Sequence, residues 1–112
     1  MNLGEPPPRY RRQPAGRTTR PPVARMVTTL GDPRKRTIVR FALDRRGEWT
    51  VDQLHERHPA VGPVRDAHTL CMQLAVVGLL AWIPTDETRL RHQPFRLRDA
   101  STAAAALASY TV

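Results

Sequence analysis

Cysteine, lysine and aromatic residues are all scarce in this chain. Its one cysteine, Cys71, cannot form an internal disulfide, which excludes the small secreted folds that disulfides hold together. Aromatic residues make up 5% of the chain and leave few platforms for stacking single-stranded bases. No apolar run approaches the roughly 20 residues needed to cross a bilayer. We therefore expect a soluble, cytoplasmic protein with no secretory signal and no membrane partner.

The usual marks of an enzyme or a metal site are also missing. There is no nucleophile motif, no glycine-rich phosphate loop and no supported pair of carboxylates. His55 and His58 share a helical face at one-turn spacing, but a metal site needs three or four ligands. Cys71 falls on a predicted buried stripe, where a free cysteine acts as a small apolar residue. We predict no catalysis, no metal and no cofactor.

Positive charge is what the chain has in excess. It carries 18 Lys+Arg against 10 Asp+Glu, for a formal net charge of +8, and every cation except Lys35 is an arginine. The planar guanidinium group fits phosphates and guanine edges better than an ammonium group does. The charge favours a polyanionic partner without identifying it, since a GC-rich genome also enriches arginine.

Much of this charge lies in residues 1–25, which differ in composition from the rest. They contain six arginines, six prolines and a single acid, Glu5. Such a segment buries too little surface to offset its ordering entropy, so we predict a disordered arm. Basic arms follow phosphates or enter a minor groove, although a solvated tail is the alternative. The arm residues predicted to bind DNA are Arg9, Arg11, Arg12, Arg17 and Arg20.

Residues 26–112 have the pattern of one folded domain. Asp32 can cap a helix whose first position is a proline, and apolar Ile38 and Phe41 recur at helical spacing, which predicts a helix over residues 33–45 ended by Arg46-Gly47. Residues 50–53 (TVDQ) fit a capping box and predict a short helix before Pro59. Residues 59–63 hold two prolines and a glycine, which predicts a turn without regular structure.

A third helix is predicted over residues 63–77 and closed by Gly78. Its buried stripe consists of Ala67, Leu70, Cys71, Leu74 and Val77. Residues 79–83 predict a strand and residues 84–88 a polar turn. Residues 89–97 predict a return strand interrupted at Pro94, on which Arg89 and Arg91 point to the same side. Asp99 can cap a last helix of about ten residues.

This order is mainly α with a small β-hairpin, an α+β fold with the layout of a winged helix-turn-helix. Three segments resemble ArsR-type transcriptional regulators: LGDPRKRTIVRFAL (residues 30–43), GEWTVDQL (47–54) and VVGLLAW (76–82), with RLRHQPFRL (89–97) where the wing returns. The resemblance covers roughly residues 28–98. The chain departs from the family in its longer HPAVGP turn, in DAHTLCMQL on the third helix, and in lacking the Cys-x-Cys metal motif. The resemblance therefore implies a fold and DNA binding but not metal sensing.

The resemblance also implies that the third helix enters the major groove. It places four residues of that helix against base edges, where arginine suits guanine and glutamine suits adenine: Arg65, His68, Thr69 and Gln73. Arg89 and Arg91 would reach phosphates or a minor groove from the base of the wing, because Asp86 and Glu87 make its tip acidic. The run Arg34-Lys35-Arg36 can also meet phosphates, although such a run is more commonly just solvated.

These features predict a sequence-specific, double-stranded DNA-binding transcription regulator. The resemblance implies a homodimer formed through the first and last helices (the last at about residues 99–110), with Leu107 and Tyr110 as anchors. Two alternatives remain open. One is a winged-helix module that docks on a protein partner, a polymerase or another DNA-bound complex. The other is a non-specific architectural DNA binder led by the arm.

Overall fold

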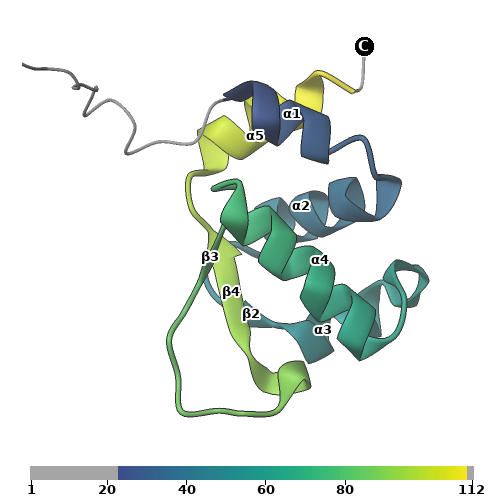
Figure 1. Cartoon of the computed structure of the whole chain (residues 1–112), viewed down its shortest axis with the longest axis vertical. Coiled ribbons are helices and arrows are strands. Elements are labelled where there is room, and N and C mark those ends of the chain that lie inside the picture. The colour runs from purple at the N-terminus through teal and green to yellow at the C-terminus, as the bar shows by residue number, and fades with distance from the viewer. Residues whose placement is uncertain (1–22, 111–112) are drawn as a thin grey trace, which may run out of the picture.

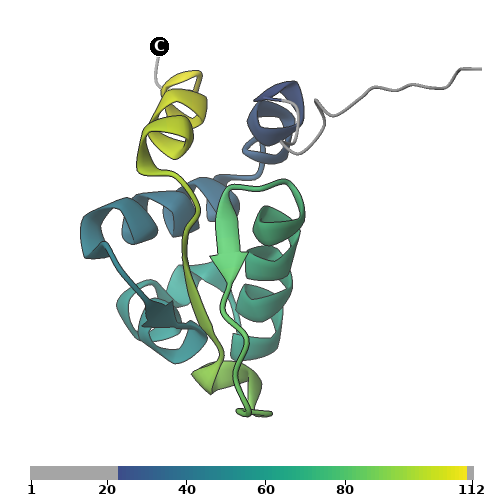
Figure 2. The same ribbon diagram turned by 90° about the vertical axis from the view of Figure 1, so that its left-hand side faces the viewer.

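Five α-helices and a three-stranded antiparallel sheet make up residues 23–110, the part of the chain that the computed structural model describes (Figure 1). In chain order the elements are α1 (Val23–Thr29), α2 (Pro33–Arg45), β2 (Trp49–Thr50), α3 (Val51–Arg57), η3 (Pro59–Val61), α4 (Val64–Val76), β3 (Leu80–Trp82), η4 (Leu90–His92), β4 (Pro94–Leu97) and α5 (Ala100–Ala108). Helices α1 and α5 lie at one end of the domain, and the loop between β3 and η4 lies at the other (Figure 1 and Figure 2). The mainly helical α+β class predicted from the sequence is confirmed.

Helix α2 begins and ends where the sequence predicts. A carboxylate oxygen of Asp32 accepts the backbone N–H of Arg34 at 2.9 Å, which caps the helix at its first proline. The chain leaves the helix at Arg46, with φ 54°, followed by Gly47, with φ 73°.

Helix α3 starts with the predicted capping box. The Thr50 hydroxyl accepts the Gln53 backbone N–H at 3.2 Å, while the Gln53 side-chain oxygen accepts the Thr50 backbone N–H at 2.9 Å. The turn that follows differs from the prediction, because Pro59–Val61 form a short 3₁₀ helix. A proline suits the first position of such a helix, and burial of the Val61 side chain holds the turn in place.

Helix α4 buries the stripe that its spacing predicts. The side chains of Ala67, Leu70, Cys71, Leu74 and Val77 are all buried. The helix runs from Val64 to Val76, with Pro63 at its N-cap, and Gly78 follows with φ 89°. Burial raises the pKa of the Cys71 thiol, so this group stays protonated and is a packing residue.

The sheet has the strand order β2-β4-β3, with Phe95 of β4 opposite both Trp49 and Trp82. The predicted return strand over residues 89–97 is wrong in its first half: Leu90–His92 form a 3₁₀ helix, and β4 begins only at Pro94. Pro94 has no N–H to continue the ladder, and η4, which includes the half-buried Leu90, packs against α3 and α4. Consequently, Arg89 and Arg91 do not share one side of a strand.

An unpredicted helix, α1, precedes Gly31. Residues 23–25, which the sequence assigned to the disordered arm, are its first turn. Its stability comes from Met26 and Leu30, one turn apart and both buried in the core. The boundary between arm and domain therefore lies at or before residue 23, and the five arm arginines predicted to bind DNA lie outside the described residues.

The core is centred on aromatic rings from three elements. Phe41 contacts the edge of Trp49 at 5.2 Å between ring centroids, and Phe95 stacks on Trp49 at 5.9 Å. Trp49 is 1% exposed, and within residues 23–110 its indole N–H has no hydrogen-bond acceptor. These contacts fix β2 and β4 against α2, so the sheet and the helices form one packed unit.

Helix α5 packs on α1 and α2. Asp99 precedes it as predicted, but the Asp99 carboxylate accepts the hydroxyls of Ser101 and Thr102 and makes no cap bond to the backbone. Leu107, expected to anchor a dimer, is 8% exposed and belongs to the core of its own chain. None of the described helices has the length and apolar character that crossing a membrane requires.

Candidate nucleic-acid interface

Helix α4 presents one exposed polar stripe. Arg65, Thr69 and Gln73 are spaced by four residues, so they lie above one another on a single face, and all three are exposed. In Figure 2 the helix runs along an outer edge of the domain, with the sheet on its inner side. The stripe of Arg65, Thr69 and Gln73 is called the α4 stripe below.

The α4 stripe has donors and acceptors available for a ligand. Within residues 23–110 the Arg65 guanidinium makes no ion pair, so its N–H groups face solvent. The Thr69 hydroxyl donates to the Arg65 carbonyl oxygen at 3.1 Å and keeps only its lone pairs for a partner. Arg65 and Gln73 are therefore the two members able to make bidentate contacts.

His68, the fourth predicted base-reading residue, is placed differently. Its ring is half-buried, and its Nε2 donates to the Gln93 side-chain oxygen at 2.8 Å. The edge of the ring meets Phe95 at 5.9 Å between centroids. Gln93 in turn donates to the Glu87 carbonyl oxygen at 3.5 Å. His68 thus joins α4 to the segment after η4 and is not free to lie in a groove beside the α4 stripe.

Carboxylates lie beside the α4 stripe on the side of α2. A small pocket there is lined by Asp32, Arg34, Asp66, Thr69, Leu70 and Gln73. Arg34 pairs with Asp32 at 3.0 Å, the one ion pair found in the part of the chain that the structure describes. The hydrogen bond from Arg34 lowers the pKa of Asp32, and the two aspartates, Asp32 first and then Asp66, raise the pKa of Arg34. This flank is therefore locally acidic around one arginine.

The neighbouring cations Lys35 and Arg36 are also engaged within the domain. The Lys35 ammonium donates to the Thr29 hydroxyl at 3.1 Å. Arg36 donates to the carbonyl oxygens of Leu30 and Gly31 at 2.8 and 3.2 Å, and it stacks over Tyr110 at 5.2 Å. Lys35 and Arg36 therefore tie the start of α2 to α1 and to Tyr110 after α5, a structural role that their charge does not reveal.

The segment around η4 carries exposed cations near α4. Arg89 and Arg91 are both exposed, and η4 packs against α3 and α4. Their directions diverge because a 3₁₀ helix has three residues per turn. The Glu87 carboxylate accepts the Arg89 backbone N–H at 2.9 Å and so lies next to these cations. Their contact with DNA stays a prediction.

Two exposed apolar residues near α4 were missed by sequence reasoning. Val76, at the end of α4, is 74% exposed, and Trp82, at the end of β3, is 43% exposed. Val76 belongs to a continuous apolar run, residues 74–77. Such a run does not indicate which of its residues faces outward. Trp82 pairs with Phe95 in register, but only Phe95 is covered.

The two histidines considered as metal ligands have structural partners. The His55 Nδ1 contacts the Gly62 carbonyl oxygen at 3.0 Å, and the His58 ring meets Phe41 edge-on. Residues 23–110 contain no group of three or more His, Cys, Asp or Glu side chains able to hold a metal ion. Compared with known proteins, the chain matches no family model, no curated protein and no solved structure.

Proposed function

We propose that this chain is a winged-helix transcription regulator that binds double-stranded DNA through α4. The observation that carries the proposal is the α4 stripe, an exposed row of polar side chains at four-residue spacing in which the Arg65 guanidinium makes no ion pair with residues 23–110. A helix of 13 residues is about 20 Å long and fits the major groove. The net charge of +8 adds a general attraction for DNA.

In this arrangement Arg65 grips the O6 and N7 atoms of a guanine, and Gln73 pairs with an adenine two turns further along the helix. Thr69 accepts one hydrogen bond or contacts a thymine methyl group. His68 supports the readout indirectly, because its bond to Gln93 fixes the η4 segment beside α4. The η4 arginines Arg89 and Arg91 bind the flanking phosphates.

The functional unit is proposed to be a homodimer formed at the α1–α5 end. Ala104 and Ala105 are exposed on α5, and small side chains let two helices approach closely. Tyr110 is 39% exposed beside them, although its hydroxyl donates to the Val27 carbonyl oxygen. A twofold axis at this end gives two α4 helices that read half-sites about one turn of DNA apart.

Selection of genomic fragments by the purified full chain, at about physiological salt, tests the proposal. Non-specific affinity is then only about 10⁻⁴–10⁻⁶ M, so fragments without a site are washed away. Recovery of one inverted-repeat motif is the expected result, and sedimentation of the complex gives the number of chains bound. Fragments that share no motif contradict a sequence-reading regulator.

One observation favours a second candidate, a module that docks on another protein. The acidic flank of Asp32 and Asp66 repels a DNA backbone, and the exposed Val76 and Trp82 are typical of protein interfaces. Such a module binds no duplex in preference to another, and its protein association changes little between low and high salt. DNA binding through α4 instead weakens steeply as salt rises.

A further inference from the structure

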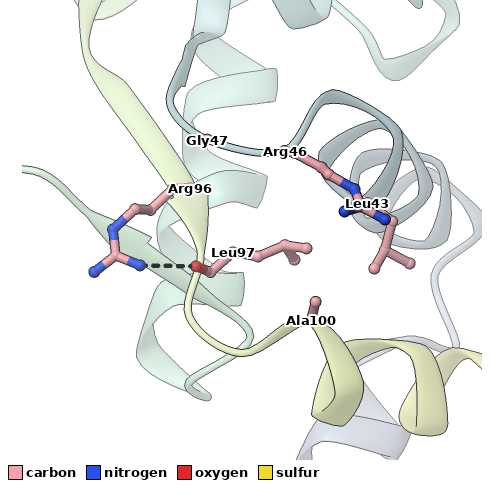
Figure 3. A pocket seen from close by; sticks show the side chains of 6 residues that line it. All are labelled: Leu43, Arg46, Gly47, Arg96, Leu97 and Ala100. Atoms are coloured by element: carbon pink, nitrogen blue, oxygen red, sulfur yellow. Dashed lines mark hydrogen bonds between the residues drawn. The ribbon is translucent and has the colours of Figure 1, made fainter.

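A pocket far from the α4 stripe opens between the end of α2, β4 and the start of α5. Its volume is about 360 Å³, and its lining residues are Leu43, Arg46, Gly47, Arg96, Leu97 and Ala100 (Figure 3). This size is within the roughly 300–1,000 Å³ typical of small-molecule sites. We propose that the pocket binds a small organic carboxylate with an apolar body.

The inner surface of the pocket is apolar. Leu43 and Leu97 pack against the core on one side, yet both remain half-exposed toward the pocket. The methyl group of Ala100 adds a third apolar contact, and a Cβ built on Gly47 would meet nothing within 4 Å. An apolar ligand body therefore covers carbon that water otherwise contacts.

The rim of the pocket carries one guanidinium group, that of Arg46. Arg46 and Leu43 lie on one side and Arg96 on the other, with Leu97 between them (Figure 3). The Arg46 guanidinium lies beside Leu43, whereas the Arg96 side chain projects to the other side of β4, where it donates to the Leu97 carbonyl oxygen at 3.1 Å (Figure 3). Neither arginine is ion-paired within residues 23–110. The carboxylate of the adjacent Asp99 is engaged by the hydroxyls of Ser101 and Thr102.

The backbone at Arg46 is a second reason to assign a ligand here. Its φ of 54° makes it the one non-glycine residue with positive φ in the described part of the chain. Glycine adopts this conformation without strain, whereas arginine does not. Folding alone favours glycine at this position, so the guanidinium at the mouth of the pocket has a use that folding does not explain.

A ligand with a carboxylate group and an apolar body fits a pocket that has an apolar lining and an arginine at its rim. The two carboxylate oxygens accept from a guanidinium in the forked geometry that arginine provides, and a chain or ring attached to the carboxylate fills the space over Leu43 and Leu97. Inorganic anions lack the apolar body, and neutral lipophiles lack the charge. The ligand class follows from the apolar lining and the guanidinium taken together, and it does not depend on DNA binding.

The test uses the isotope-labelled full chain and no DNA, with octanoate as the probe. Octanoate is expected to shift the backbone amide signals of Gly47, Leu97 and Ala100 in a saturable way. Acetate, without the chain, and 1-octanol, without the charge, are each expected to bind about tenfold more weakly. Equal effects of octanoate and acetate overturn the proposal, as do shifts spread over the whole surface.

Two variants and two controls locate the site. Arg46→Gly relieves the positive φ and so preserves the fold, and it is expected to weaken octanoate binding about tenfold. Arg96→Gln removes a charge on the other side of β4 and is expected to change octanoate binding little. Ala100→Leu fills the pocket from an exposed position and is expected to abolish binding. Arg40→Gln removes an exposed charge on α2 outside the pocket and is expected to change nothing. If Arg46→Gly and Ala100→Leu bind octanoate as the parent chain does, the pocket is not the site.

Discussion

At the scale of single residues, the Asp32 carboxylate contacts two groups of Arg34, and these contacts change its pKa. It caps α2 through the Arg34 backbone N–H and pairs with the Arg34 guanidinium. These bonds, the one to the side chain first, lower the pKa of Asp32. The folded state therefore binds a proton at this site less readily than the unfolded state does, and protonation favours unfolding.

We predict that replacing Asp32 by asparagine removes this pH dependence. The folded-state pKa is lowered, so the stabilisation is present above the unfolded pKa, about 4, and is lost as the pH falls through the lower folded value. Asparagine still caps a helix, so Asp32→Asn keeps the cap and loses only the titration. Urea unfolding from pH 6 to pH 2 measures the effect. The parent chain should lose more stability than Asp32→Asn, while Asp86→Asn, in the exposed loop, should behave like the parent.

At the scale of elements, the capping box of α3 fixes the first turn of that helix. Two reciprocal hydrogen bonds hold its first turn, and this helix has only seven residues. A helix so short depends on its cap and on tertiary packing, because propagation adds little.

We predict that Thr50→Ala destabilises the domain by about 1 kcal/mol, the usual cost of losing a threonine cap. The urea midpoint should fall without a change in the slope of the transition. Thr88→Ala serves as the matched control, since Thr88 is exposed in the loop before η4. Equal midpoints for the two variants would mean that packing alone holds α3.

Elements with local signals could be predicted from the sequence, whereas those set by distant contacts could not. Asp32-Pro33 and Thr50-Gln53 act within one turn, so α2 and α3 were predicted with correct starts. Helix α1 also has a local signal, apolar residues at 23, 26, 27 and 30, but the two prolines and many arginines before it obscured the boundary. The 3₁₀ helix η4 packs against α3 and α4, contacts that no local pattern encodes.

In the candidate interface, too, local features could be predicted from the sequence and contacts between distant residues could not. Exposure of Arg65, Thr69 and Gln73 follows from helical periodicity and was predicted correctly. The bond of His68 to Gln93 joins residues 25 positions apart, and the nearness of the Asp66 charge to Arg34 depends on how α2 meets α4. Periodicity places a residue on a face, but only the packing determines what that residue touches.

At the scale of the whole molecule, the basic segment before α1 can be separated from the folded domain. Met26 of α1 and Leu30 directly after it are buried in the core, so a deletion must stop at residue 22 to leave the domain intact. This deletion removes five arginines and one glutamate.

We predict that deleting residues 1–22 flattens the salt dependence of DNA binding but preserves site preference. If all five arginines neutralise phosphates, the slope of log K against log salt falls in magnitude by up to about 4.5. Binding isotherms on a selected site and on a scrambled duplex, from low to high salt, give both quantities. Loss of the preference together with most of the affinity would identify an architectural binder led by the arm.

The central claim is that the α4 stripe reads base sequence, and the affinity of Arg65→Ala for two duplexes tests it most directly. On the selected site the variant is expected to bind about 10- to 100-fold more weakly than the parent, as loss of a bidentate base contact predicts. On a scrambled duplex it should lose no more than Arg40→Ala, which removes one exposed charge from α2. An equal loss on both duplexes would show that Arg65 contributes charge alone and would contradict sequence reading by α4.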